Sequence, residues 1–139
     1  MLYLSEFFEK NKTLYYDNLN FVRTKNDLAQ WIKFFLTGVI QTAETGVATL
    51  QKIIQLKSST EREKVLRMGK RARQGSALLH SLFSKPVVTV KDVHILTGLS
   101  PKASNDLVQL FVTEGILKEI TGYLRNRVFV FDEYVRLFR

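Results

Sequence analysis

The chain has 139 residues, of which 45% are hydrophobic and 24% are charged. This balance is typical of a globular protein and excludes an intrinsically disordered chain. The sequence contains no cysteine, which excludes disulfides, thiolate metal sites and a cysteine nucleophile, and its net charge of +8 favours a polyanionic partner.

The start of the chain, MLYLSEFFEKN, lacks the basic leader and the apolar run of a secretion signal. The most apolar stretch, WIKFFLTGVI, is too short to span a bilayer and contains Lys33. We therefore expect a cytoplasmic protein that does not insert into a membrane.

The spacing of apolar residues predicts two helices in the first half of the chain. An apolar residue recurs every three or four positions over residues 12–23 and again over residues 28–54. Asn26 or Asp27 is the predicted N-cap of the second helix. At about 1.5 Å per residue, this long amphipathic helix would extend for about 40 Å.

Aromatic side chains are concentrated in the same region. Such a set most often forms a core, but an exposed set favours self-association. We therefore expect a homodimer through the N-terminal helices, or contact with another protein. The residues concerned are Phe7, Phe8, Tyr15, Tyr16, Trp31, Phe34 and Phe35.

The positive charge is densest in residues 57–73, which hold seven basic and two acidic side chains. Apolar residues are sparse there, so we predict an exposed connecting helix and a boundary near Gly75, between a helical segment (1–75) and a second domain (76–139). Such a run is usually a solvated helix face; as a binding site, it suits diffuse attraction to a polyanion. The residues of this predicted basic helix are Arg62, Lys64, Arg67, Lys70, Arg71 and Arg73.

The second domain has shorter predicted elements. A helix over residues 76–83 precedes a β-branched edge strand over residues 86–90. Gly98 ends the next helix, and Ser100 caps another that begins at Pro101 and stops at Gly115. Two β-prone runs then flank a turn. This order predicts a mainly α fold that ends in a winged helix-turn-helix with a small β-hairpin.

A helix-turn-helix places its second helix in the major groove of DNA. The polar residues available to read bases from that helix are Lys102, Ser104, Asn105 and Gln109. The hairpin turn adds Arg125, Asn126 and Arg127 as candidate DNA contacts, and its two arginines are better suited to phosphates or the minor groove. Asp106 and Glu114 make the helix net negative, and phosphates would repel them. Two interpretations therefore stay open, DNA contact and a module for protein interaction or regulation.

Three stretches of the chain resemble bacterial Fic proteins: LYLSEFFEKNKTLYYDNL, WIKFFLTGV and the ending from PVVTVKDV onward. The first two are similar to the region that follows the Fic catalytic motif, and the ending is similar to the winged helix found after many Fic cores. The resemblance implies a C-terminal piece of an adenylyl-transfer protein. A missing catalytic core would then be a further partner for the N-terminal helices.

The catalytic motif of the Fic family, H-P-F-x-[DE]-G-N-G-R-x-x-R, does not occur in this sequence. The two histidines are His80, followed by Ser81, and His94, followed by Ile95. Neither has a second ligand at a metal-binding spacing. We therefore expect no catalytic residue, no metal site and no cofactor for this chain. ATP and a divalent cation are implied only for a complete family member.

These observations predict a non-catalytic regulatory or targeting region of a Fic-type adenylyl-transferase. The alternative is a stand-alone DNA-binding protein similar to transcription regulators. An enzymatic role would require that the chain complete a split active site.

Overall fold

The computed structural model describes residues 3–139, and the chain divides into two compact units. Unit 1 ends at Gln51 and unit 2 spans Lys52–Arg139, so the division lies well before the boundary predicted near Gly75. The described chain is mainly helical and has one small antiparallel sheet, as expected. None of the helices within residues 3–139 is both long and apolar enough to cross a bilayer.

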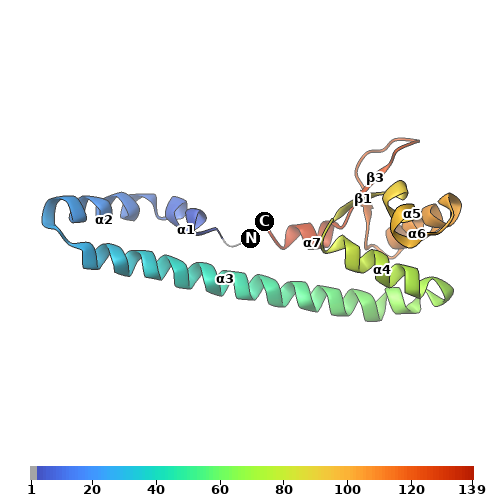
Figure 1. Ribbon diagram of the computed structural model, residues 1–139, viewed down its shortest axis with the longest axis horizontal. Coiled ribbons are helices and arrows are strands. Elements are labelled where there is room, and N and C mark those ends of the chain that lie inside the picture. Colours follow the sequence, from blue (N-terminus) through green and yellow to red (C-terminus); the bar gives the residue numbers. More distant parts are fainter. Residues whose placement is uncertain (1–2) are drawn as a thin grey trace. The chain divides into compact units, whose positions relative to one another are not determined.

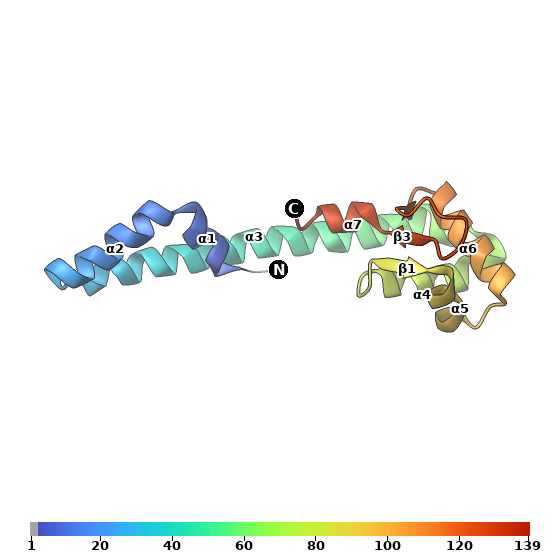
Figure 2. The ribbon, with the colours of Figure 1, turned by 90° about the horizontal axis from the view of Figure 1, so that it is seen from above.

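Unit 1 consists of α1 (Leu4–Lys10), α2 (Lys12–Lys25) and the beginning of α3 (Leu28–Glu63). Both ribbon views place α1 and α2 beside the beginning of α3 (Figure 1, Figure 2). Aromatic rings fill the space between these helices. The ring centroids of Phe7 and Phe34 are 5.4 Å apart, and those of Tyr15 and Trp31 are 5.6 Å apart.

Two residues make the turn between α2 and α3. Asn26 adopts the left-handed conformation, with φ of 52°, and ends α2, a role that asparagine tolerates better than most residues. Asp27 Oδ1 accepts a hydrogen bond from the backbone N–H of Gln30 at 3.1 Å. Asp27 is therefore the N-cap of α3, as one of the two sequence-based alternatives predicted.

Unit 2 contains the end of α3, three more α-helices of eight residues or more, two 3₁₀ turns, three short strands and a short final helix. In chain order, these elements are η1 (Val65–Arg67), η2 (Gly69–Arg71), α4 (Ala72–Leu82), β1 (Val87–Thr89), α5 (Val90–Thr97), α6 (Pro101–Thr113), β2 (Lys118–Glu119), β3 (Val128–Val130) and α7 (Asp132–Arg136).

The sheet has the strand order β1-β3-β2, and both pairs are antiparallel. In its register, Val88 of β1 and Glu119 of β2 both lie opposite Phe129 of β3. The prediction of an edge strand after Pro86 is confirmed, because β1 is at an edge of the sheet. Phe129 is fully buried, so the central strand anchors the sheet to the core.

The hydrophobic core lies in unit 2. Every hydrophobic residue that is buried in the described chain belongs to this unit, from Leu56 near the end of α3 to Phe131 before α7. The largest fully buried side chains are Phe111, Phe129 and Phe131. Residues 3–51 contain no buried hydrophobic side chain, which sets unit 1 apart.

The prediction of one exposed basic helix over residues 57–73 is wrong. The helix α3 ends at Glu63, and η1 and η2 follow it. Val65 is fully buried in the core. A Cβ atom added to Gly75 of α4 would lie 3.1 Å from Val65 Cγ1 and 3.2 Å from Met68 Sδ. The missing side chain at Gly75 therefore lets η1 approach α4 closely, and Gly75 is a packing position rather than a linker.

Candidate nucleic-acid interface

A capping box fixes the start of α5. Thr89 Oγ1 accepts a hydrogen bond from the Asp92 backbone N–H at 3.2 Å, and Asp92 Oδ2 accepts one from the Thr89 backbone N–H at 2.8 Å. Lys85 Nζ donates to Asp92 Oδ1 at 2.9 Å. The Lys85 hydrogen bond, followed by those from Thr89, lowers the pKa of Asp92 to about 2. The carboxylate therefore ties the end of β1 to the first turn of α5.

The link between α5 and α6 is short and well defined. Gly98 ends α5 with φ of 68°, a left-handed conformation that favours glycine. Ser100 Oγ accepts a hydrogen bond from the Ala103 backbone N–H at 3.2 Å, and Pro101 occupies the first position of α6. The helix stop and the helix start predicted here are both confirmed. Together they fix the path of the chain into α6.

The residues of α6 that were predicted to read bases differ in their exposure to solvent. Lys102 is exposed, whereas Asn105 and Gln109 are half-buried. Ser104 is fully buried, and its hydroxyl donates to the Leu99 carbonyl at 3.4 Å. Ser104 therefore cannot contact a base, and its predicted role is wrong.

Arg127, predicted to contact DNA from the hairpin, is held by neighbouring side chains. Its Nη2 donates to Asn105 Oδ1 at 3.0 Å, and its Nη1 lies 3.6 Å from Glu119 Oε2. Its guanidinium also lies over the Phe129 ring, 5.5 Å from the centroid. Arg127 and Asn105 thus bind each other, and Glu119 offsets the arginine charge.

The role of Glu119 was not predicted from the sequence. Glu119 lies opposite Phe129 in the sheet, so Arg127, two residues before Phe129, is its diagonal cross-strand neighbour. Side chains at such diagonal positions are within reach when they are long. The ion pair follows from the strand register, which the sequence alone did not reveal.

The tip of the hairpin between β2 and β3 carries both a charged and an apolar side chain. Gly122 and Asn126 both have positive φ, 64° and 53°, which turns the chain at two points. Arg125 and Asn126 are exposed, and within residues 3–139 no carboxylate lies at ion-pair distance from Arg125. Leu124 is 101% exposed. The tip therefore offers one free cation beside an unpartnered apolar side chain.

The basic residues near the end of α3 lie on four elements, α3, η1, η2 and α4, and on the segment between α3 and η1, rather than on one helix. Four of the six are exposed, and two are half-buried. The exposed ones are Arg62, Arg67, Lys70 and Arg73, and the half-buried ones are Lys64 and Arg71. No carboxylate of the described chain pairs with any of them. Their side chains are consequently available to an external anion.

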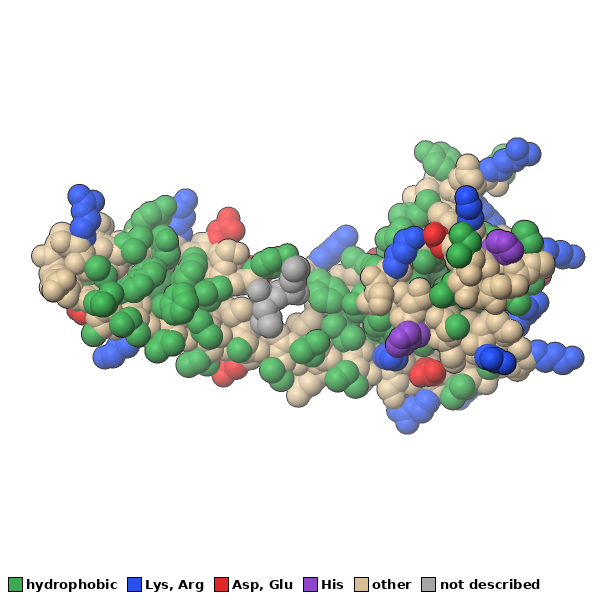
Figure 3. Space-filling model, viewed as in Figure 1, with side chains coloured by type: hydrophobic (Ala, Val, Ile, Leu, Met, Phe, Trp, Pro, Cys, Tyr) green, Lys and Arg blue, Asp and Glu red, His purple; other side chains and the backbone are tan. Residues whose placement is uncertain are grey.

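The net charge belongs entirely to unit 2. Unit 1 holds five basic and five acidic residues, whereas unit 2 holds 16 basic and eight acidic residues. Three of these 16 cations form ion pairs, namely Lys85, Arg127 and Arg136. Figure 3 shows Lys and Arg side chains spread over the visible surface of unit 2.

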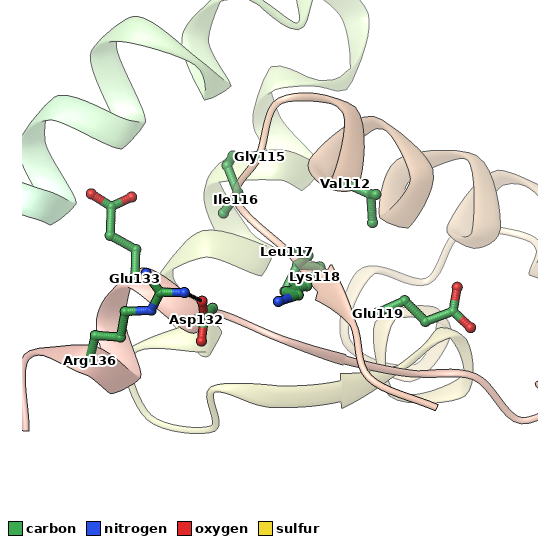
Figure 4. A pocket seen from close by; sticks show the side chains of 9 residues that line it. All are labelled: Val112, Gly115, Ile116, Leu117, Lys118, Glu119, Asp132, Glu133 and Arg136. Atoms are coloured by element: carbon green, nitrogen blue, oxygen red, sulfur yellow. Dashed lines mark ion pairs between the residues drawn. The ribbon is translucent and has the colours of Figure 1, made fainter. Parts of the chain in front are cut away.

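An open hollow of about 630 Å³ lies between the end of α6, β2 and α7. Figure 4 shows its lining residues, with Arg136 paired to Asp132. Lys118, Glu119 and Glu133 add one positive and two negative charges. None of the lining side chains, all of them described, keeps a buried polar atom without a partner. The hollow therefore indicates no particular ligand.

Each of the two histidines contacts a neighbouring group through Nδ1. His80 is exposed, and its Nδ1 lies 3.3 Å from Lys57 Nζ. His94 is half-buried and uses Nδ1 to contact the Leu99 carbonyl in the link before α6. Within residues 3–139, no group of three or more His, Asp or Glu side chains could hold a metal ion.

Comparison of the sequence with protein-family models and with curated proteins gives no match.

Proposed function

We propose that unit 2 is a winged helix-turn-helix module that binds duplex DNA, mainly through the backbone phosphates. The order of its elements supports this assignment. Helix α4 and strand β1 precede the helix pair α5 and α6, and the hairpin between β2 and β3 follows. In this arrangement α6 is the helix that enters the major groove, and residues 120–127 form the wing.

The observation that carries the proposal is the confinement of the +8 charge to unit 2. An excess of cations on one folded unit attracts a polyanion and releases its counterions. The cations outside ion pairs include Arg125 at the hairpin tip and four exposed residues near the end of α3. These side chains can contact phosphates without any change in the fold.

The residues of α6 favour binding that depends little on sequence. Ser104 is buried, and Asn105 already accepts a hydrogen bond from Arg127. Asp106 is exposed on the same helix, and its negative charge would repel a phosphate. Only Lys102 is both exposed and cationic in α6. Base reading is therefore a minor contribution in this proposal, and phosphate contacts supply the affinity.

Substitutions in the hairpin test this proposal. Binding of labelled duplex DNA is measured by fluorescence anisotropy over a series of salt concentrations. Arg125→Ala should flatten the log–log salt dependence by about 0.9, because the variant neutralises one phosphate fewer. Arg127→Ala should flatten it less, because Glu119 already offsets this charge. Arg23→Ala, an exposed cation of unit 1, is the matched control and should change nothing. Equal slopes for all three variants would contradict the proposal.

We further propose that the chain acts as a regulatory or targeting region of a Fic-type adenylyl-transferase. The three resembling stretches support this context, and the sequence lacks the family's catalytic motif. In this context the chain transfers no AMP by itself. Incubation with labelled ATP and acceptor proteins should give no labelling above a control without the chain, and labelling that follows the purified chain would overturn this assignment. A stand-alone regulator that binds DNA is the alternative context.

A protein partner is the second candidate for unit 2, because the hairpin tip is apolar as well as basic. Leu124 is fully exposed and Tyr123 is 66% exposed, and exposed side chains of this kind contribute to protein interfaces. Leu124→Ser distinguishes the two candidates. If unit 2 binds DNA phosphates, the substitution should leave DNA affinity and its salt dependence nearly unchanged.

A further inference from the structure

Unit 1 lacks a core that could stabilise it alone. Residues 3–51 bury no hydrophobic side chain, and Asn18 and Gly38 are their only buried residues. Units of this size are marginal even with a good core, and many need a partner. The aromatic contacts of α1 and α2 with α3 are made by Trp31, Phe34 and Phe35 of α3.

The helix α3 carries an exposed apolar stripe. Its members recur at intervals of three, four or eight residues, as expected for one face of a helix. Each of them is between 40% and 57% exposed. This α3 stripe consists of Leu28, Ile32, Leu36, Val39, Val47 and Leu50. Figure 3 shows hydrophobic side chains gathered over the helices of unit 1.

We propose that unit 1 forms a homodimer in which the α3 stripe of one chain packs against that of a second copy. The net charge of unit 1 favours a second copy of this chain, rather than a different protein, as the partner of the stripe. Unit 1 has five residues of each charge sign, so its net charge is zero. Two copies can therefore approach through unit 1 without the repulsion that two surfaces of unit 2 would experience, and nothing in unit 1 selects a partner of opposite charge.

The apolar area of unit 1 matches the requirement of a dimer. Homodimer interfaces are about 65% apolar, so a standard interface of about 800 Å² per partner needs roughly 500 Å² of apolar surface. At on the order of 50 Å² each, the six residues of the α3 stripe provide roughly 300 Å² of this area. The five other exposed apolar side chains of α2 and of α3 up to Gln51 are available for the remainder. A spacing of three and four residues also suits the pairing of two helices.

Sedimentation velocity of the whole chain tests the proposal. We expect a particle of twice the 16.1 kDa chain mass, with the monomer appearing only on dilution. Leu36→Glu combined with Val39→Glu should weaken the dimer at least about tenfold. Ile95→Glu, which changes an exposed apolar residue of unit 2 that is 71% exposed, is the matched control and should leave the dimer intact.

Cross-linking keeps the test valid if the double variant fails to fold. The chain has no cysteine, so a single introduced cysteine can form a disulfide only with the same residue of a second copy. Leu36→Cys, on the α3 stripe, should form a disulfide-linked dimer under mild oxidation. Gln41→Cys, an exposed position outside the stripe, should not. A monomer at every concentration, or equal cross-linking at both positions, would overturn the proposal and leave another protein as the occupant of the stripe.

Discussion

The substitution Val65→Ala tests whether residues 57–73 belong to the core of unit 2. Val65 is fully buried and packs near Gly75 of α4. Truncation to alanine removes two buried carbons, at about 0.8 kcal/mol each, and leaves a cavity. The expected loss of unfolding free energy is about 2–3 kcal/mol. For a unit of this size, this corresponds to a Tm lower by roughly 10–15 °C.

The adjacent residue supplies the matched control. Leu66 is 56% exposed, so Leu66→Ala should change the free energy of unfolding by less than about 0.5 kcal/mol. Calorimetry measures both variants. Trp31, the only tryptophan, lies in unit 1, so its fluorescence shows whether unit 1 is affected. Equal, small effects of Val65→Ala and Leu66→Ala would refute the reasoning and restore a solvated connecting segment.

Three further substitutions test individual packing and capping interactions. Gly38→Ala places a Cβ 2.5 Å from Phe7 Cδ1 and should destabilise unit 1 by about 1–3 kcal/mol, measured by Trp31 fluorescence during urea unfolding. Gly98→Ala requires a left-handed alanine and should lower the free energy of unfolding of unit 2 by about 1–2 kcal/mol, measured by calorimetry. Asp92→Asn should cost about 1 kcal/mol near neutral pH, a modest value because the carboxylate is 36% exposed. The folded-state pKa of Asp92, about 2, is below its ordinary value of 3.8, so this stabilisation is present above about pH 4 and is lost as the pH falls through about 2. Unfolding of both proteins over that pH range should show the difference shrink, and a constant difference would contradict the assignment.

The elements with strong local signals could be predicted from the sequence. The long apolar repeat located α3, and the positions of Gly98, Ser100 and Pro101 defined the link between α5 and α6, because their side chains act on the backbone next to them. The mainly helical fold and the edge strand β1 followed from similar local patterns.

The end of α3 could not be predicted in the same way. Val65 and Met68 are among only a few apolar residues in a charged segment, and so few residues do not establish a period. Both side chains pack against Gly75. Gly75 is too far away in the sequence for local helix propensity to indicate this contact. Residues 65–71, predicted to be part of an exposed helix, therefore form two 3₁₀ turns that pack against α4.

In the candidate site, the burial of Ser104 could have been predicted from the sequence, whereas the pairing of Arg127 could not. Ser104 precedes Leu107 and Val108 by three and four residues on the buried face of α6, so periodicity could have predicted its burial. The pairing of Arg127 with Asn105 and Glu119 joins three separate segments. That pairing depends on the strand register and on the packing of α6, which neither spacing nor composition reveals.

The most direct test of the central proposal, phosphate binding by unit 2, is the salt dependence of DNA binding by the unmodified chain. We expect log Kobs to fall linearly with log salt concentration, by about 0.9 for each phosphate contacted. The slope and the affinity should be nearly the same for duplexes of unrelated sequence, because α6 offers few free side chains to the bases. Failure to bind duplex DNA at low salt, or binding that does not respond to salt, would contradict the proposal.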